Sequence, residues 1–441
     1  MGMPITSGPR ETTNTSGQLS LDEARLMPIH VIAALACLGG AALDGYILGI
    51  IGPALALAKN ELLLTAMSQG LIACSALIGV FIGGLVFGNF ADRYGRRPVF
   101  SWNLAAFIAL SLCQFFVQDI WQLVVIRLLL GLAIGVEYAV GSTVLAEFSR
   151  RKNRGALLGC FTIAWQIGFT AAFIIGAFYE GDNWRMLLGS SVIPAVIIYL
   201  LRLQLPETPM WLRAQGRDAE ARAIVDKHFG EHYAIPDVDA SPKSASLGEL
   251  FKRDTWRQSL FSGLFWFCQV GPFFAIFTFM VPVLETLGLQ GDHRVDLSLN
   301  AIQIAGVVFG VFLVHWTSRR GFVIWTFVAV LAIFLALGLF AHAPTWFVVS
   351  LFATYMFIGP AINNIQFVYP PEIFDTHVRA TGIGFSAAFS RISAAGVTYL
   401  LPSLLQAFGF SATLIMMAGF PLLGLVVTLL WAPETKGKAL R

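Results

Sequence analysis

Charged residues are scarce in this chain. Only 12% of its 441 residues are Asp, Glu, Lys or Arg, whereas ordinary soluble domains carry about 25%, and 56% are hydrophobic. The few basic residues stand between apolar blocks, and the formal net charge is only +3. The composition therefore excludes a water-soluble fold, and it lacks the basic footprint of a protein that binds DNA or RNA.

Patterns that carry chemistry are missing as well. The five cysteines all lie in apolar stretches, without the paired spacing of a disulfide framework or a metal site. The chain shows no nucleophile–base pairing and no phosphate-binding glycine loop. Residues 1–27 have no cleavable signal pattern and predict a flexible cytoplasmic tail. We therefore expect neither an enzyme nor a bound metal or cofactor.

Long apolar runs are what the chain has in abundance. Twelve blocks of roughly 20 to 25 residues are each long enough for a helix to cross about 30 Å of hydrocarbon. The pattern predicts an all-α membrane protein with six-helix bundles at 28–204 and 257–432, a helical linker at 205–256 and a tail at 433–441. Basic residues collect on one side of the alternating crossings, which places both termini in the cytoplasm.

The two halves of the chain share landmarks at a nearly constant offset. The matched positions are Glu147 with Glu372, Arg154 with Arg379, Arg96-Arg97 with Arg319-Arg320, and Pro206-Glu207-Thr208 with Pro433-Glu434-Thr435. Duplicated halves of this kind are typical of transporters, which place the solute near the membrane midplane where the halves meet.

The loop after the second block is short and dense in charge, and it reads Gly88-Asn-Phe-Ala-Asp92-Arg93-Tyr-Gly95-Arg96-Arg97. The fourth block carries Arg127-xxx-Gly131-xxx-Gly135, and Pro-Glu-Thr closes both halves. These motifs resemble the major facilitator superfamily, in its branch of sugar porters and related metabolite–proton symporters. The resemblance covers nearly the whole chain and implies twelve helices, in two pseudosymmetric bundles of a single chain, that rock about a central site.

A gating role is predicted for the charge-dense loop and its repeat mates. The loop is expected to stabilise the outward-open state through contacts at the cytoplasmic end. The residues concerned are Gly88, Asp92, Arg93, Gly95, Arg96, Arg97, Glu147, Arg154, Glu372 and Arg379.

Charged side chains inside hydrocarbon cost about 2.5 kcal/mol or more each, so those within the apolar blocks are functional candidates. Asp44 and Glu137 are predicted to take up and release a proton, with Arg127 in the same block as Glu137; fixed ion pairs that only pack helices are the alternative. Arg391 is predicted to bind a solute carboxylate, because its guanidinium stays charged and its fork fits two oxygens. A permanent pair with Glu137 or Asp44 is the alternative for Arg391.

Amides and phenylalanines are expected to line the rest of the site. They are Gln166, Gln269, Phe273, Phe277, Asn363, Asn364 and Phe367. By the resemblance, Gln166 and Gln269 match positions that bind hydroxyls in sugar porters, but the asparagine of their seventh helix is replaced here by a phenylalanine-rich segment.

The predicted function is proton-coupled uptake of a small organic acid across a bacterial inner membrane, with membrane lipid around the chain. A sugar or polyol porter, and a membrane sensor that binds a solute without transporting it, stay open as alternatives.

Overall fold

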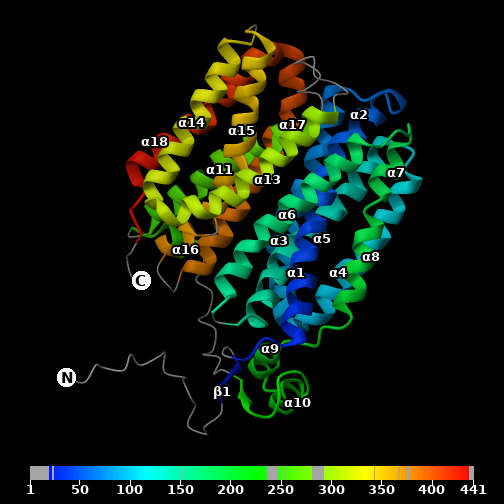
Figure 1. The fold of residues 1–441 in the computed structure, drawn as a ribbon, viewed down its shortest axis with the longest axis vertical. Coiled ribbons are helices and arrows are strands. Elements are labelled where there is room, and N and C mark those ends of the chain that lie inside the picture. Colours follow the sequence, from blue (N-terminus) through cyan, green and yellow to red (C-terminus); the bar gives the residue numbers. More distant parts are fainter. Residues whose placement is uncertain are drawn as a thin grey trace, which may run out of the picture.

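The computed structural model describes residues 19–436, except 22–23, 151, 236–246, 254, 281–292, 342, 367 and 375–377. Phe367, one of the predicted lining residues, lies outside the described residues, and of Gly88 and Asp92 only the backbone is described. The described chain is almost entirely helical and forms two bundles, one from each half of the sequence, that lie side by side (Figure 1).

The first bundle follows the first six apolar blocks. Its helices are α1 (Pro28–Gly49) with α2 (Ile51–Glu61), α3 (Ala66–Tyr94), α4 (Arg96–Cys113) with the short η2 (Gln114–Phe116), α5 (Ile120–Glu147), α6 (Arg154–Ala177), and α7 (Trp184–Gly189) with α8 (Val192–Arg202). Polar residues between the blocks start the helices: the Thr65 side chain accepts a hydrogen bond from the Ser68 N–H, and that of Asp119 accepts one from Gln122.

The second bundle follows the remaining apolar blocks. Its helices are α11 (Trp256–Thr278), α13 (His293–Trp316), α14 (Arg319–Leu339), α15 (Thr345–Gln366), the short α16 (Tyr369–Ile373), α17 (Arg379–Met417) and α18 (Gly419–Trp431). Within α17 the backbone is not helical at Gly409, where φ is 75° and ψ is 176°. Glycine adopts this conformation without the steric cost of a Cβ, so one crossing ends and another begins at that point.

Ten helical stretches of the described chain are long and apolar enough to cross a membrane. The last of them, Thr381–Trp431, has 51 residues and is divided by the break at Gly409, so it accounts for two crossings. The shorter apolar stretch Ser298–Val314 of α13 supplies another. The predicted fold of twelve helices in two bundles is therefore confirmed.

The linker between the bundles folds into α9 (Pro209–Ala214), α10 (Asp218–His228), β2 (Tyr233–Ala234) and η3 (Leu247–Phe251). The strand β1 (Leu19–Ser20) pairs with β2 in parallel, and Leu21 is buried in the same cluster as α9 and α10. This part of the N-terminal segment differs from the flexible tail that the sequence predicts, because burying Leu21 and pairing two strands offset the entropy of ordering it.

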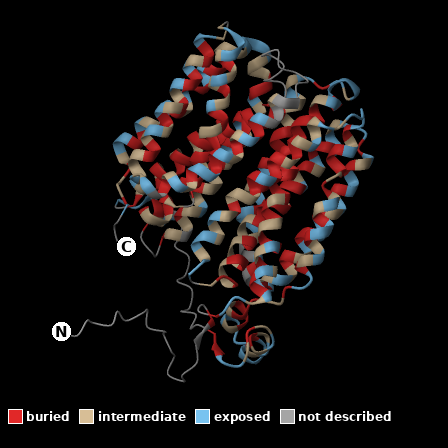
Figure 2. Cartoon of the chain, in the orientation of Figure 1, coloured by how far each residue is buried: buried red, intermediate tan, exposed pale blue. Residues whose placement is uncertain are grey.

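The two bundles pack tightly where glycine allows their backbones to approach. A Cβ on Gly70 of α3 would lie 2.1 Å from the carbonyl oxygen of Tyr399 in α17, and one on Gly52 would lie 2.6 Å from that of Thr278. Buried residues fill the bundle interiors and the region where the bundles face each other, and exposed residues cover the outer faces (Figure 2). The contact between the halves is therefore part of the core.

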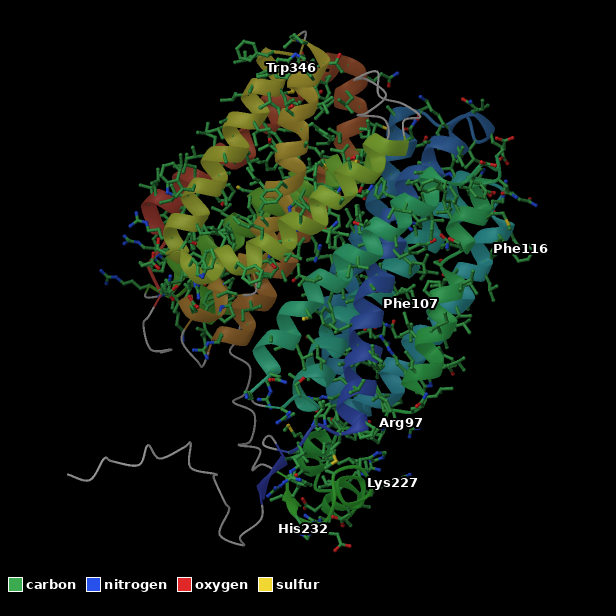
Figure 3. All side chains as sticks on the ribbon, viewed as in Figure 1. Arg97, Phe107, Phe116, Lys227, His232 and Trp346 are labelled. Carbon is green, nitrogen blue, oxygen red and sulfur yellow. The ribbon has the colours of Figure 1, made fainter. Side chains whose placement is uncertain are left out.

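The two ends of the molecule differ in their side chains. Arg97, Lys227 and His232 lie toward one end, and Phe116 and Trp346 lie toward the other (Figure 3). We call the first the basic end; the loop at Arg96-Arg97, its repeat mate at Arg319-Arg320 and the linker helices form it. Aromatic residues such as Trp346, which is 70% exposed, are common where a membrane surface meets water.

Candidate functional site

Asp44 lies in α1 and is completely buried. Neither of its carboxyl oxygens has a hydrogen-bond partner among the described residues. The neighbouring Gly45 lets α1 approach α6 so closely that a Cβ there would be 2.0 Å from the carbonyl oxygen of Trp165. An ionised carboxylate in such a place would lose its hydration without compensation, so the site favours the neutral acid.

Glu137 of α5 forms a buried ion pair with Arg202 of α8. The Arg202 Nη2 atom donates to Glu137 Oε1 at 2.5 Å, and neither side chain is exposed. Arg202 also donates to the Phe100 carbonyl oxygen at 3.0 Å, and the Asn103 side chain donates to Glu137 at 3.4 Å. Both charges are therefore compensated. Arg202 was not among the predicted residues, although it is a basic side chain that precedes the Pro206-Glu207-Thr208 motif within the sixth apolar block.

Gly40 of α1 makes room for this pair. A Cβ on Gly40 would lie 2.1 Å from Glu137 Oε1 and 2.2 Å from Arg202 Nη2. Asp44 follows Gly40 by four residues, so the two share one face of α1, about one helical turn apart. The structure thus brings the predicted acids Asp44 and Glu137 into one region, with Arg202 as a third member.

Arg127 of α5 contacts the backbone of α1 and not the acids. Its Nη1 atom donates to the carbonyl oxygen of Ile47 in α1 at 2.7 Å, and the side chain is buried. Its Nε and Nη2 atoms have no hydrogen-bond partner in the described part of the chain. The contact fastens α5 to α1 one turn beyond Asp44, while Glu137 is neutralised by Arg202.

Arg391 of α17 lies between aromatic rings from both bundles. Its guanidinium carbon is 5.4 Å from the ring centre of Tyr138 in α5 and 5.5 Å from that of Phe274 in α11. Aromatic rings at this distance attract the guanidinium electrostatically. No hydrogen bond or ion pair of Arg391 occurs with the residues that the structure describes. Tyr138 directly follows Glu137, so Arg391 borders the acidic region without pairing with its acids.

Aromatic side chains from α6 and α11 meet between the bundles. Trp165 lies edge-on to Phe274 at 5.8 Å, Phe169 lies edge-on to Phe277 at 6.0 Å, and Phe273 stacks on Phe277 at 4.2 Å between ring centres. The phenylalanines of α11 were predicted to line the site. Trp165 and Phe169 were not, because single aromatic residues in apolar blocks give no sign of which helix they face.

Amide groups bond across the same region. Gln166 of α6 donates to Gln303 of α13 at 2.9 Å, and Gln269 of α11 donates to Asn363 of α15 at 3.4 Å. Asn364 instead donates to the Val307 carbonyl oxygen at 2.9 Å and ties α15 to α13. Gln166 thus bonds from the first bundle to the second, whereas Gln269 and Asn363 bond to each other within the second bundle, and Asn364 is used for helix packing.

The basic end shows the same contacts twice. Arg96 pairs with Glu147 at 2.9 Å in the first bundle, and Arg319 pairs with Glu372 at 3.1 Å in the second. Both pairs join helices of a single bundle. Arg154 donates to the Ser149 carbonyl oxygen, and Arg379 donates likewise to that of Phe374.

The glutamates of the two Pro-Glu-Thr motifs also act alike. Glu207 accepts from the N–H of Arg97 at the start of α4, and Glu434 accepts from the N–H groups of Arg319 and Arg320 at the start of α14. Gly95 precedes α4 with φ at 105°, a value that favours glycine, and Arg93 lies over the ring of Tyr94. The internal repeat is therefore a repeat of geometry as well as of sequence.

Two pseudosymmetric bundles with polar groups buried where they meet define the class of secondary transporters. The family model described as "Sugar (and other) transporter" matches residues 32–441, and the chain belongs to this family. The inner membrane metabolite transport protein YgcS of Escherichia coli (strain K12) is 37% identical over 426 residues, 96% of this chain and 95% of that protein. The putative metabolite transport protein YaaU of the same organism is 34% identical, with 96% of both chains covered.

A solved structure has the same fold. The xylose transporter XylE from E. coli, in a partially occluded inward-open conformation, matches with a TM-score of 0.77 at 19% identity over 93% of this chain and 99% of that one. The chain is thus a multi-pass membrane transporter of the major facilitator superfamily. It is not an enzyme, and transporters of this family need no cofactor.

Proposed function

We propose that this protein carries a small organic acid together with protons across a bacterial inner membrane, by alternating access between its two bundles. The observation that carries the proposal is that Arg391 lies between the two bundles without a hydrogen-bond acceptor among the described residues. Its guanidinium lies against rings from both bundles, and its N–H groups have no hydrogen-bond partner in the described chain.

A solute carboxylate would supply the hydrogen-bond acceptors that the Arg391 guanidinium lacks among the described residues. A guanidinium offers five N–H donors in a planar fork that matches two carboxylate oxygens. The ring of Phe274 lies beside it, Phe273 packs on Phe274, and Phe277 packs on Phe273; these rings would cover a flat or partly apolar body of the solute. This combination of one charged clamp and an apolar wall fits a small organic acid better than a solute with many hydroxyl groups.

The proton is assigned to the acids of the first bundle. Asp44 and Glu137 share the region beside Tyr138, and Tyr138 is the residue on which Arg391 lies. A movement of one bundle against the other would therefore alter the surroundings of the acids and of the solute together. A relative of the same fold supports the coupling ion, because one of the matched structures is a D-xylose–proton symporter.

The basic end is assigned to the cytoplasm, together with both termini. Its arginines, together with the lysines and arginines of the linker, agree with the excess of Lys and Arg on the inner side of membrane proteins. The pairs Arg96–Glu147 and Arg319–Glu372 would then brace the cytoplasmic ends of the helices during gating.

A sugar porter is the second candidate. Gln166 bonds to Gln303 across the two bundles, and Gln269 bonds to Asn363 within the second bundle, so a sugar hydroxyl could replace either amide partner. A relative such as the glucose transporter GlcP of Staphylococcus epidermidis, 24% identical over 93% of this chain, is in keeping with this candidate.

Thermal unfolding of the purified protein separates the two candidates, because a ligand that binds only the native state raises its stability. We expect benzoate to raise the unfolding midpoint, while its neutral counterpart benzamide, xylose and choline leave it unchanged. Arg391→Gln should abolish the benzoate shift. Arg185→Gln, which removes a cation that pairs with Glu61 near the ends of α2 and α7, should keep it. A shift with xylose and none with any carboxylate would favour the sugar porter.

A further inference from the structure

The linker that joins the two bundles is divided between them. Its helices α9 and α10 and its strand β2, which we call the linker cap, share one apolar cluster with α1 and α5 of the first bundle. The cap lies beyond the end of the first bundle (Figure 1). The last part of the linker, η3, packs instead on the second bundle, where Leu250 is buried with Phe374 and Val378. The cap is therefore packed as a part of the first bundle.

The N-terminal segment fastens this cap. Residues 19–21 and 24–27, which we call the N-terminal strap, lead from β1 to the start of α1. The strand β1 pairs in parallel with β2 of the cap, and the Arg25 N–H donates to the Tyr233 hydroxyl at 3.4 Å. Leu21 is only 5% exposed and belongs to the apolar cluster of the cap. The strap thus holds the cap through both backbone pairing and apolar burial.

The junction between the strap and α1 is also packed on the cap. The Met27 N–H donates to His30 Nδ1 at 3.0 Å, and the His30 ring lies edge-on to that of Phe229, which follows α10, at 5.3 Å between ring centres. Within the cap, Arg222 of α10 donates to the Tyr233 carbonyl oxygen at 2.7 Å, so β2 is attached to α10. Strap, cap and the start of α1 therefore form one packed unit.

This unit reaches the charge-dense loop of the first bundle. Glu207, which precedes α9, accepts the N–H of Arg97. A Cβ on Gly95 would lie 3.3 Å from the ring of Trp211 in α9, so the loop packs directly against the cap. Any loosening of the cap would therefore be felt at the Arg97 N–H.

The second bundle has the same loop contact without a cap. Glu434 accepts the N–H groups of Arg319 and Arg320, as Glu207 does for Arg97. In the part of the chain that the structure describes, no helix follows α18. The two copies of the loop thus share a hydrogen bond but differ in what supports it.

We propose that the N-terminal strap is a clamp, which fixes the linker cap to the first bundle and, through α9, braces the charge-dense loop of that bundle and not its repeat mate. Ordering the strap costs backbone entropy, and the burial of Leu21 together with the strand pairing offsets that cost. The cap then moves with the first bundle when the two bundles move against each other. The clamp is independent of which solute the protein carries.

Hydrogen–deuterium exchange of the purified protein tests the clamp without a solute, because backbone exchange reports local opening. Leu21→Ser removes a buried apolar side chain, which shifts the opening equilibrium about tenfold or more. We expect the amides of α9 and α10 and that of Arg97 to exchange about tenfold faster, and those of Arg319 and Arg320 to stay within about twofold of the wild type. Leu26→Ser, at a position of the same strap that is 65% exposed, should leave all of these rates unchanged.

A disulfide between the paired strands should give the opposite change. Ser20 and Ala234 are register partners in β1 and β2, so Ser20→Cys/Ala234→Cys brings two cysteines within bridging range. Cys113→Ser and Cys160→Ser are added to remove the thiols that are not fully buried. The oxidised protein should exchange the amides of α10 more slowly than the same protein after reduction.

Two kinds of result would overturn the proposal. One is that α9 and α10 exchange at the wild-type rate in Leu21→Ser, or that the bridge forms without slowing their exchange. The other is that the Arg97 amide does not respond, or that Arg319 and Arg320 accelerate as much as Arg97, because the strap would then not brace the first loop selectively. The bridge needs no destabilising substitution, so it decides the outcome if Leu21→Ser fails to fold.

Discussion

The two bundles share their basic ends but differ in their interiors. Both have an arginine–glutamate pair, at 2.9 Å for Arg96–Glu147 and 3.1 Å for Arg319–Glu372, and both cap a helix with the glutamate of a Pro-Glu-Thr motif. Buried acids within the spans occur in the first bundle, as Asp44 and Glu137, whereas the described spans of the second bundle present Arg391. Both copies thus keep the same contacts at the basic end, whereas the buried acids and Arg391 lie in different copies.

Replacement of Asp44 by Asn should have the largest effect on transport, because it removes the group to which the proton is assigned. We expect pH-driven accumulation of benzoate in proteoliposomes to be abolished. Exchange of labelled for unlabelled benzoate without a gradient should continue, since Arg391 in the other bundle is intact. If accumulation persists in this variant, the division of roles between the bundles fails.

Loss of Arg202 should have the largest effect on stability. Arg202→Ala leaves the buried Glu137 without the cation that compensates it, which costs about 3–5 kcal/mol of unfolding free energy. The double variant Glu137→Gln/Arg202→Gln should cost clearly less. Both are measured by thermal unfolding in detergent, and an equal loss in the two variants would show that Arg202 acts through packing and not through its charge.

The repeated pairs at the basic end allow a direct comparison of the copies. Arg96→Gln and Arg319→Gln each remove a partly exposed ion pair, so we expect a loss of about 1–2 kcal/mol from either one. Because the pairs have similar distances and exposure, the two losses should match in thermal unfolding. A large difference between the variants would mean that the two pairs contribute unequally to the free energy of unfolding.

The smallest expected effect on stability is that of replacing Glu434, the glutamate that caps α14 in the second bundle, and it depends on pH. Burial opposes ionisation of Glu434, but the N–H groups of Lys436, Arg319 and Arg320 donate to its carboxylate and hold its pKa below the ordinary value. The stabilisation is therefore present at neutral pH and is lost as the pH falls through that lowered pKa. An acid at a helix N-terminus contributes about 0.3–1 kcal/mol, so Glu434→Gln should lower the unfolding midpoint slightly at neutral pH. The difference from the wild type should vanish in acid, and a difference that grows in acid would contradict the assignment.

The fold was largely predictable, because crossing a membrane imposes a length and a composition on every helix. Twelve apolar blocks and the landmarks repeated between the halves were enough to predict two six-helix bundles. The site was predictable only in part. Asp44, Glu137 and Arg391 stand out as charges in apolar blocks, but the role of Arg202 was hidden by its place at the end of a block, where basic residues are usual. Trp165, Phe169 and Gln303 were hidden because apolar and amide residues are common in such blocks.

The sequence by itself determined the number of helices, their grouping into halves and the residues whose charge in hydrocarbon has to be compensated. The tertiary structure decided which charge compensates which: Glu137 is paired with Arg202, 65 residues further along the chain, and not with Arg127 or Arg391. The reason is physical. Each segment that crosses lipid must be apolar by itself, so this requirement is visible in the local composition. An ion pair between helices instead depends on how closely the helices approach. At Gly40 the absence of a side chain allows that approach.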